Sequence, residues 1–150
     1  MSYVRTLFHI VFRTKESIPA LSPEHAKDLF LYIWGFCKEK NCTLIRINGM
    51  SEHLHLLLRL HPDVALSAFV RDLKIATSLW LKREREKFPL FSGWARSYAA
   101  FSYSSREQAT VAAYIEKQQE HHRKHSFSEE FRAFLEENGI PIDERYFLSE

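Results

Sequence analysis

The chain has 150 residues, the usual size of one domain, and its 45% hydrophobic content is enough to bury a core. Its formal net charge of +2 is only a weak indication of an anionic partner. No apolar run is long enough to cross a bilayer, and two cysteines are too few for a disulfide framework or a zinc knuckle. We therefore expect a single domain over residues 1–150, with reduced cysteines and no membrane segment.

The first half of the chain is predicted to contain three strands and two helices. These are a strand within 4–13, a helix over 23–40, strands over 42–50 and 53–60, and a helix over 64–88. Ser22 is the expected N-cap of the first helix, with Pro23 at its first position. Asn48-Gly49 is the expected turn between the second and third strands, because this dipeptide favours hairpin turns.

The second half is predicted to contain one strand over 96–104, a helix that includes 111–125, and a last short helix. That helix is expected to begin at Ser126 or Ser128 and to end near Gly139. The order β-α-β-β-α-β with two further helices indicates an α+β, ferredoxin-like (RRM-like) split βαβ fold. We expect an antiparallel four-stranded sheet with helices on one face, and a C-terminal helix that bears a tyrosine. Such a fold does not by itself assign a function.

Two histidines interrupt the leucines of the predicted third strand. Because side chains alternate along a strand, Leu54, Leu56 and Leu58 can face the core while His53 and His55 share the opposite face. Their side chains would start roughly 7 Å apart, a spacing from which two imidazoles can reach one ion. The alternative is a pair of surface histidines, or histidines bonded to backbone groups.

The predicted helix after the fourth strand places Tyr114 and Gln118 four residues apart, and therefore on one face. An unassisted tyrosine is a poor nucleophile at neutral pH, but a nearby divalent cation would polarise a phosphate oxygen. The alternative for Tyr114 is an amphipathic residue at the edge of a packed helix. His121, His122 and His125 extend this stripe; they could assist proton transfer, although local packing is the simpler interpretation.

Charged side chains are candidates for contacts with nucleic acid. The expected phosphate contacts are Arg13, Lys15, Arg71, Lys74 and Arg83. The alternative for each is a solvated surface charge. The acidic residues near the C-terminus, Glu129, Glu130, Glu136 and Glu137, fit an ordinary solvated helix face.

Three segments, GMSEHLHLLLRL (49–60), YAAFSYS (98–104) and YIEKQQEHHRKHSFSEEF (114–131), together resemble the insertion-sequence 200/605 family of single-tyrosine HUH transposases. FHIVFRTK (8–15) and FLEENGIPIDERYFL (134–148) are similar to the same family, so the resemblance spans almost the whole chain. It implies that His53 and His55 are metal ligands, that Gln118 is the third protein ligand and that Tyr114 is the nucleophile.

The resemblance also implies an activity and its partners. The expected protein is a bacterial or archaeal cytoplasmic enzyme that cuts and rejoins single-stranded DNA at hairpin-marked element ends, through a 5′-phosphotyrosine. Nitrogen and amide-oxygen ligands fit Mg²⁺ or Mn²⁺, and two imidazoles favour Mn²⁺. One tyrosine per chain implies a homodimer, in which the tyrosine helix can complete the partner's site.

Three alternatives stay open at this point. The chain could be a domesticated relative that nicks repeated genomic hairpins, a non-catalytic ferredoxin-like module that binds single-stranded nucleic acid, or a metal-dependent hydrolase that uses water in place of Tyr114.

Overall fold

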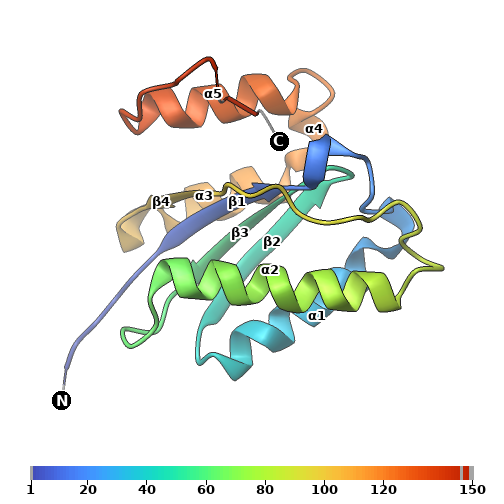
Figure 1. Ribbon diagram of the computed structural model, residues 1–150. Coiled ribbons are helices and arrows are strands. Elements are labelled where there is room, and N and C mark those ends of the chain that lie inside the picture. Colours follow the sequence, from blue (N-terminus) through green and yellow to red (C-terminus); the bar gives the residue numbers. More distant parts are fainter. Residues whose placement is uncertain (1, 146, 149–150) are drawn as a thin grey trace.

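A four-stranded antiparallel sheet forms the centre of the computed structural model, which describes residues 2–145 and 147–148 (Figure 1). The strands are β1 (Phe8–Arg13), β2 (Thr43–Met50), β3 (His53–Arg59) and β4 (Ala99–Ser102). Their order across the sheet is β2-β3-β1-β4, which is the arrangement of a ferredoxin-like fold. The predicted α+β class is confirmed. Met1, Tyr146 and residues 149–150 of the predicted domain lie outside the described residues.

Helices cover both faces of this sheet. In Figure 1, α1 (Ala26–Glu39) and α2 (Leu66–Arg83) lie beneath the sheet, and α5 (Phe127–Glu137) lies above it. On the side of α5, α3 (Gln108–Glu116) packs on β2 and β3, and the short α4 (Gln118–His121) follows it. The helices predicted for one face are therefore α1 and α2, and the tyrosine-bearing helix is on the other face. No described helix is long and apolar enough to cross a membrane.

The alternation of β3 separates the two faces. Leu54, Leu56 and Leu58 are completely buried against α1 and α2, in one large hydrophobic core. Leu57 points the other way, into a smaller cluster beneath α3. Residues directly opposite in an antiparallel pair share a face, and β1 places Arg13 opposite His53. The sheet therefore presents an apolar face to α1 and α2, and a face with polar side chains to α3–α5.

The predicted turn at Asn48-Gly49 is wrong, because both residues belong to β2 and the hairpin turns at Ser51-Glu52. Gly49 pairs with Leu54, and a Cβ at Gly49 would lie 2.3 Å from the His53 carbonyl oxygen. The glycine is needed for this close approach of two strands, not for a turn. The side chain of Asn48 instead bonds to the end of α3, as described below.

Two helix predictions also need correction. The helix predicted over 111–125 breaks at Lys117, where the backbone leaves helical geometry between α3 and α4. Ser22 does not cap the first helix, since its hydroxyl donates to the Lys87 carbonyl oxygen at 2.8 Å. By contrast Ser126 caps α5 as expected, accepting the backbone N–H of Glu129 at 3.2 Å.

Candidate metal and tyrosine site

The two histidines of β3 lie side by side beneath α3–α5, and both are completely buried. Their ring centroids are 5.0 Å apart, so the spacing predicted from strand alternation brings the imidazoles together. A histidine pair in an apolar interior needs partners for its ring nitrogens. These partners determine which nitrogen atoms face the centre of the site.

The Nδ1 atom of each histidine has a hydrogen-bond partner. Glu52, in the hairpin turn, bonds to His53 Nδ1 at 2.9 Å, and His9 Nε2 on β1 bonds to His55 Nδ1 at 2.7 Å. Partners of this kind fix the orientation of a ligating imidazole and leave Nε2 for a metal. Burial lowers the pKa of His55 to about 4, so its imidazole is neutral at physiological pH and has a lone pair to offer.

The end of α3 and the start of α4 place Tyr114 and Gln118 beside the histidines. Asn48 Nδ2 donates to the Ile115 and Glu116 carbonyl oxygens at 3.0 and 3.1 Å, which anchors this helix end on β2. Gln118, also completely buried, lies with its Oε1 atom 3.3 Å from His53 Nε2. The Tyr114 ring lies 6.2 Å from the ring of His55 of the same chain. The chain therefore assembles all four predicted site residues without a second subunit.

Glu130 of α5 is a site residue that the sequence analysis missed. Its Oε1 atom lies 3.0 Å from His55 Nε2, while its Oε2 atom accepts the Tyr114 hydroxyl and, at 3.1 Å, the Gln118 amide. Ligand atoms of His53, His55 and Glu130 all lie within 4.8 Å of one another. The expected solvated face is thus wrong for Glu130, which is 8% exposed.

A sequence signal for Glu130 does exist. It follows Phe127 by three residues and precedes Phe134 by four, so it shares their helix face. Phe127 is buried, and the ring of Phe134 lies 5.1 Å from that of His9. An acidic residue on the apolar stripe of an amphipathic helix needs a buried partner, and here the partners are the histidines and the tyrosine.

The Glu130 carboxylate is one anion that His53, His55 and Tyr114 share. Burial alone would raise the pKa of Glu130, but hydrogen bonds with His53 and His55 hold it well below its usual range. Burial and the hydrogen bond to Glu130 raise the pKa of Tyr114 far above its usual value. Glu130 therefore stays ionised, and Tyr114 stays protonated while it donates to that carboxylate.

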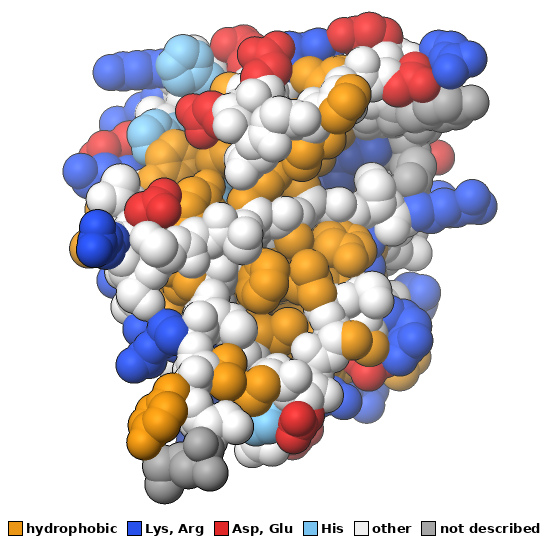
Figure 2. Space-filling model, turned by 90° about the vertical axis from the view of Figure 1, so that its left-hand side faces the viewer, with side chains coloured by type: hydrophobic (Ala, Val, Ile, Leu, Met, Phe, Trp, Pro, Cys, Tyr) orange, Lys and Arg blue, Asp and Glu red, His pale blue; other side chains and the backbone are white. Residues whose placement is uncertain are grey.

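Solvent reaches the tyrosine through a cavity of about 340 Å³ between α4 and α5. Tyr114 and His121 line it, together with three acidic residues of α5, Glu129, Glu130 and Glu137. Figure 2 shows acidic side chains and histidines near the top of one face, over the C-terminal part of the chain. The approach to Tyr114 is consequently acidic while α5 is in place.

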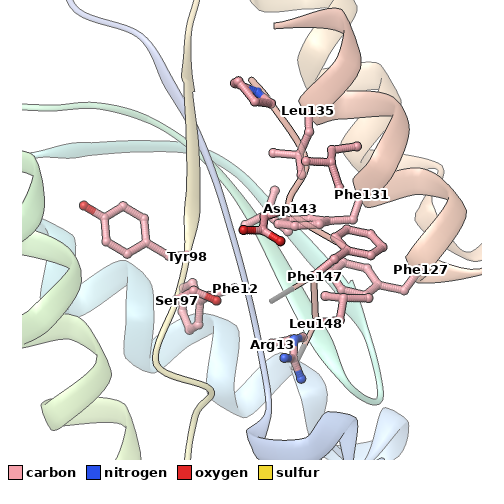
Figure 3. A pocket seen from close by; sticks show the side chains of 13 residues that line it. Phe12, Arg13, Ser97, Tyr98, Phe127, Phe131, Leu135, Asp143, Phe147 and Leu148 are labelled. Atoms are coloured by element: carbon pink, nitrogen blue, oxygen red, sulfur yellow. The ribbon is translucent and has the colours of Figure 1, made fainter. Parts of the chain in front are cut away.

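A second cavity, of about 190 Å³, lies between β1 and the C-terminal segment. Figure 3 shows Phe127, Phe131 and Phe147 grouped along one side of it and Arg13 at its lower end. Arg13 is 4% exposed and donates to the Ser17 hydroxyl at 3.1 Å. Of the five predicted phosphate contacts, Arg13 is the one that stands beside His53 in the sheet.

The structure does not bring the other predicted phosphate contacts to the histidines. Arg71, Lys74 and Arg83 belong to α2, on the opposite face of the sheet. Arg71 pairs with Asp72, and Lys74 donates to backbone carbonyl oxygens of 95–97. Lys15 is exposed, two residues beyond Arg13. A spacing rule cannot tell which face a helix will cover, and this explains the mismatch.

A basic groove on the side of α3 has no counterpart in the sequence analysis. Its lining includes four arginines, Arg5, Arg46, Arg59 and Arg106. Small and polar residues near the start of α3 line the rest of it, together with Ile45. No acidic side chain is among the described residues that line the groove. Arg59 donates to Gln108, which holds that guanidinium in place.

A ferredoxin-like sheet whose central strand presents a His-x-His pair to a helix-borne tyrosine defines the class of single-tyrosine DNA-processing domains that the sequence resembles. The family model described as "Transposase IS200 like" matches residues 2–118. The chain belongs to this family, and its function is that of a transposase, an enzyme that cuts and transfers DNA.

Individual relatives agree with this assignment. The chain is similar to the transposase for insertion sequence element IS200 of Salmonella typhimurium, at 26% identity over 75% of this chain and 76% of the relative. It is similar to the ISDra2 transposase TnpA of Deinococcus radiodurans, at 28% identity over 74% of this chain and 82% of the relative.

Solved structures resemble the fold. A Deinococcus radiodurans R1 protein described as a transposase matches with a TM-score of 0.59 and 27% identity, over 79% of this chain and 95% of that one. A REP-associated tyrosine transposase bound to a REP hairpin matches with a TM-score of 0.56 over 78% of this chain and 68% of that one. Its 16% identity supports the fold alone.

Proposed function

We propose that the chain cuts and rejoins single-stranded DNA through a covalent 5′-phosphotyrosine at Tyr114, with a divalent cation held by His53, His55 and Gln118. The observation that carries this proposal is the convergence of two imidazole Nε2 atoms and one amide oxygen beside a tyrosine hydroxyl, in one buried cluster. The donor set fits a divalent cation because the Nδ1 atoms of both histidines are occupied, which leaves both Nε2 atoms for the metal. Mg²⁺ and Mn²⁺ both accept nitrogen and amide-oxygen ligands, and two imidazoles favour Mn²⁺.

The bound cation would polarise a non-bridging oxygen of the scissile phosphate and stabilise negative charge in the transition state. Tyr114 attacks the phosphorus, so that the bond from its phenolic oxygen forms as the bond to the 3′ oxygen breaks. The hydroxyl of Tyr114 loses its proton, and the leaving 3′ oxygen gains one. Asn48 fixes the end of α3 and so holds Tyr114 beside the histidines. A 3′-OH from another end reverses the step and joins the strands without ATP.

The DNA partner follows from the same chemistry. Because each chain offers one tyrosine for this reaction, cutting two ends requires two chains, and a homodimer is the simplest assembly. The arginine groove is suited to the phosphates of the strand that leads to Tyr114. Hairpins at the element ends and the cytoplasmic location belong to this proposal as well.

One assay tests the reaction. Labelled single strands from both flanks of the gene are incubated with the protein and Mg²⁺ or Mn²⁺, then run on a denaturing gel. A covalent protein–DNA adduct that is lost in Tyr114→Phe supports the proposal. Cleavage that survives Tyr114→Phe indicates a hydrolase, and a gel shift without cleavage indicates a binding module. Tyr32→Phe on α1 is the matched control, since its hydroxyl only approaches the Ala76 carbonyl oxygen at 3.4 Å on the far side of the sheet.

A further inference from the structure

Three imidazole Nε2 atoms surround the carboxylate of Glu130. Its Oε1 atom lies 3.0 Å from His55 Nε2, 3.6 Å from His53 Nε2 and 3.5 Å from His122 Nε2. The side chains of Glu130 and His122 are only 5% and 7% exposed. A third imidazole, from the end of α4, therefore faces the same point as the two imidazoles of β3.

The Nε2 atom of His122 is buried without a hydrogen-bond partner among the described residues. At 3.5 Å, its contact with Glu130 is longer than an ordinary hydrogen bond. Buried polar atoms are almost always bonded, so an orphaned imidazole nitrogen aimed into a cluster of ligand atoms needs an explanation. A cation at the centre of the cluster would supply the missing partner.

We infer that Glu130 and His122 are additional ligands of the metal, so that five side chains hold it: His53, His55, Gln118, His122 and Glu130. This inference rests on the proposed function and extends it from three protein ligands to five. This assignment gives a role to QQEHHRKHSF (118–127), the part of the 114–131 segment that carries His122 and leads directly into α5.

The distances between donor atoms suit this assignment. Donors bonded to one cation at about 2.1 Å lie about 3.0 Å apart at right angles and about 3.4 Å apart at tetrahedral angles. Four separations among the proposed ligand atoms run from 3.0 to 3.6 Å, and the ligand atoms of His53, His55 and Glu130 all lie within 4.8 Å of one another. A cluster held by hydrogen bonds alone would show more separations near 2.9 Å.

The packing of α5 holds Glu130 in place. The Phe127 ring lies 4.2 Å from that of His53, and the Phe134 ring lies 5.1 Å from that of His9. Glu130 stands between these two anchors on the inner face of the helix. The cation would thus join β3 and α4 to α5, and metal binding would be coupled to the docking of α5.

This ligand set has a preference among metals. Three imidazoles with one carboxylate and one amide oxygen suit Mn²⁺, Co²⁺ or Zn²⁺ better than Mg²⁺, which prefers oxygen ligands and retains water. The same cation would also supply Lewis-acid chemistry to an oxygen of the DNA phosphate.

Calorimetric titration of EDTA-treated full-length protein with Mn²⁺ tests the inference. We expect Glu130→Gln and His122→Asn each to weaken Mn²⁺ binding at least ten-fold. The controls are Glu136→Gln on the exposed face of α5 and exposed His125→Asn, which should remain within two-fold of the unsubstituted protein. Pulsed EPR of the bound Mn²⁺ should show fewer coupled imidazole nitrogens in His122→Asn. Circular dichroism verifies folding, and Glu130→Asp replaces Glu130→Gln if the latter does not fold.

The possible outcomes distinguish failure of the five-ligand site from failure of the three-ligand site in the proposed function. If Mn²⁺ binds with undiminished affinity to Glu130→Gln and His122→Asn but fails to bind to His55→Ala, the three-ligand site stands and the five-ligand site is overturned. If His55→Ala also binds Mn²⁺ normally, the metal assignment of the proposed function fails with it.

Discussion

The two faces of the sheet show how one strand can serve stability and chemistry at once. On the face toward α1 and α2, β3 contributes leucines to a large apolar core. On the face toward α3–α5, the same strand contributes two buried histidines that need a carboxylate, an amide and a tyrosine around them. The apolar face is satisfied by burial alone, whereas the polar face is satisfied only by specific partners. Substitutions on the two faces should therefore fail in different ways.

The largest effect is expected from His55→Ala. Loss of one imidazole removes cation-dependent stabilisation of several kcal/mol, so cleavage should fall by roughly a thousand-fold or more. Binding of single-stranded DNA should remain within a few-fold, measured by gel shift. The control variant is His61→Ala, which replaces a more exposed histidine just beyond β3 and should cleave DNA normally. Cleavage retained by His55→Ala would contradict the metal role of this face.

Leu56→Ala tests the apolar face next to it. This leucine is completely buried, so truncation should lower the free energy of unfolding by about 2–5 kcal/mol, measured by urea denaturation. Well below its melting temperature the variant should still cleave DNA, because Leu56 points away from the site. A cleavage defect in the folded variant would mean that the two faces are not independent.

Asn48→Ala tests the link between the sheet and α3. The substitution removes the donors to two carbonyl oxygens at the end of α3, which should cost about 1–2 kcal/mol in the free energy of unfolding. Cleavage should fall about ten-fold, because Tyr114 and Gln118 lose their positioning. Gln119→Ala removes the exposed hydrogen bonds that join Gln119 to the Asn48 side chain and to the Gly49 carbonyl oxygen, and it should have a smaller effect on both measurements.

The smallest effect concerns the thiols. Burial raises the pKa of Cys37 to about 12, so this thiol stays protonated and unreactive at pH 8. Cys42 is buried as well, at 4% exposed. Iodoacetamide should label neither cysteine appreciably in the folded protein and both after denaturation. Rapid labelling of folded protein would show that the apolar face opens readily.

Much of the fold was predictable from periodicity. The alternation in β3 correctly separated the core leucines from the histidines, and the order of elements indicated the ferredoxin-like class. The predictions failed where a side chain contacts residues that are distant in the sequence. Asn48-Gly49 has the composition of a turn, but its side chain and its close backbone approach serve α3 and β3. The helix breaks at Lys117 without a proline or glycine that would have predicted the break.

The sequence by itself determined which side chains share a face, because strand and helix periods are local properties of the backbone. It therefore paired His53 with His55, and it placed Tyr114 and Gln118 within reach of each other. Only the tertiary structure decided what meets these groups across the site. Glu130 reaches the histidines because α5 folds back over the sheet, and His122 reaches them from the end of α4. Arg71, Lys74 and Arg83 lie away from them because α2 covers the other face. Such encounters depend on how helices pack in three dimensions, which no local spacing specifies.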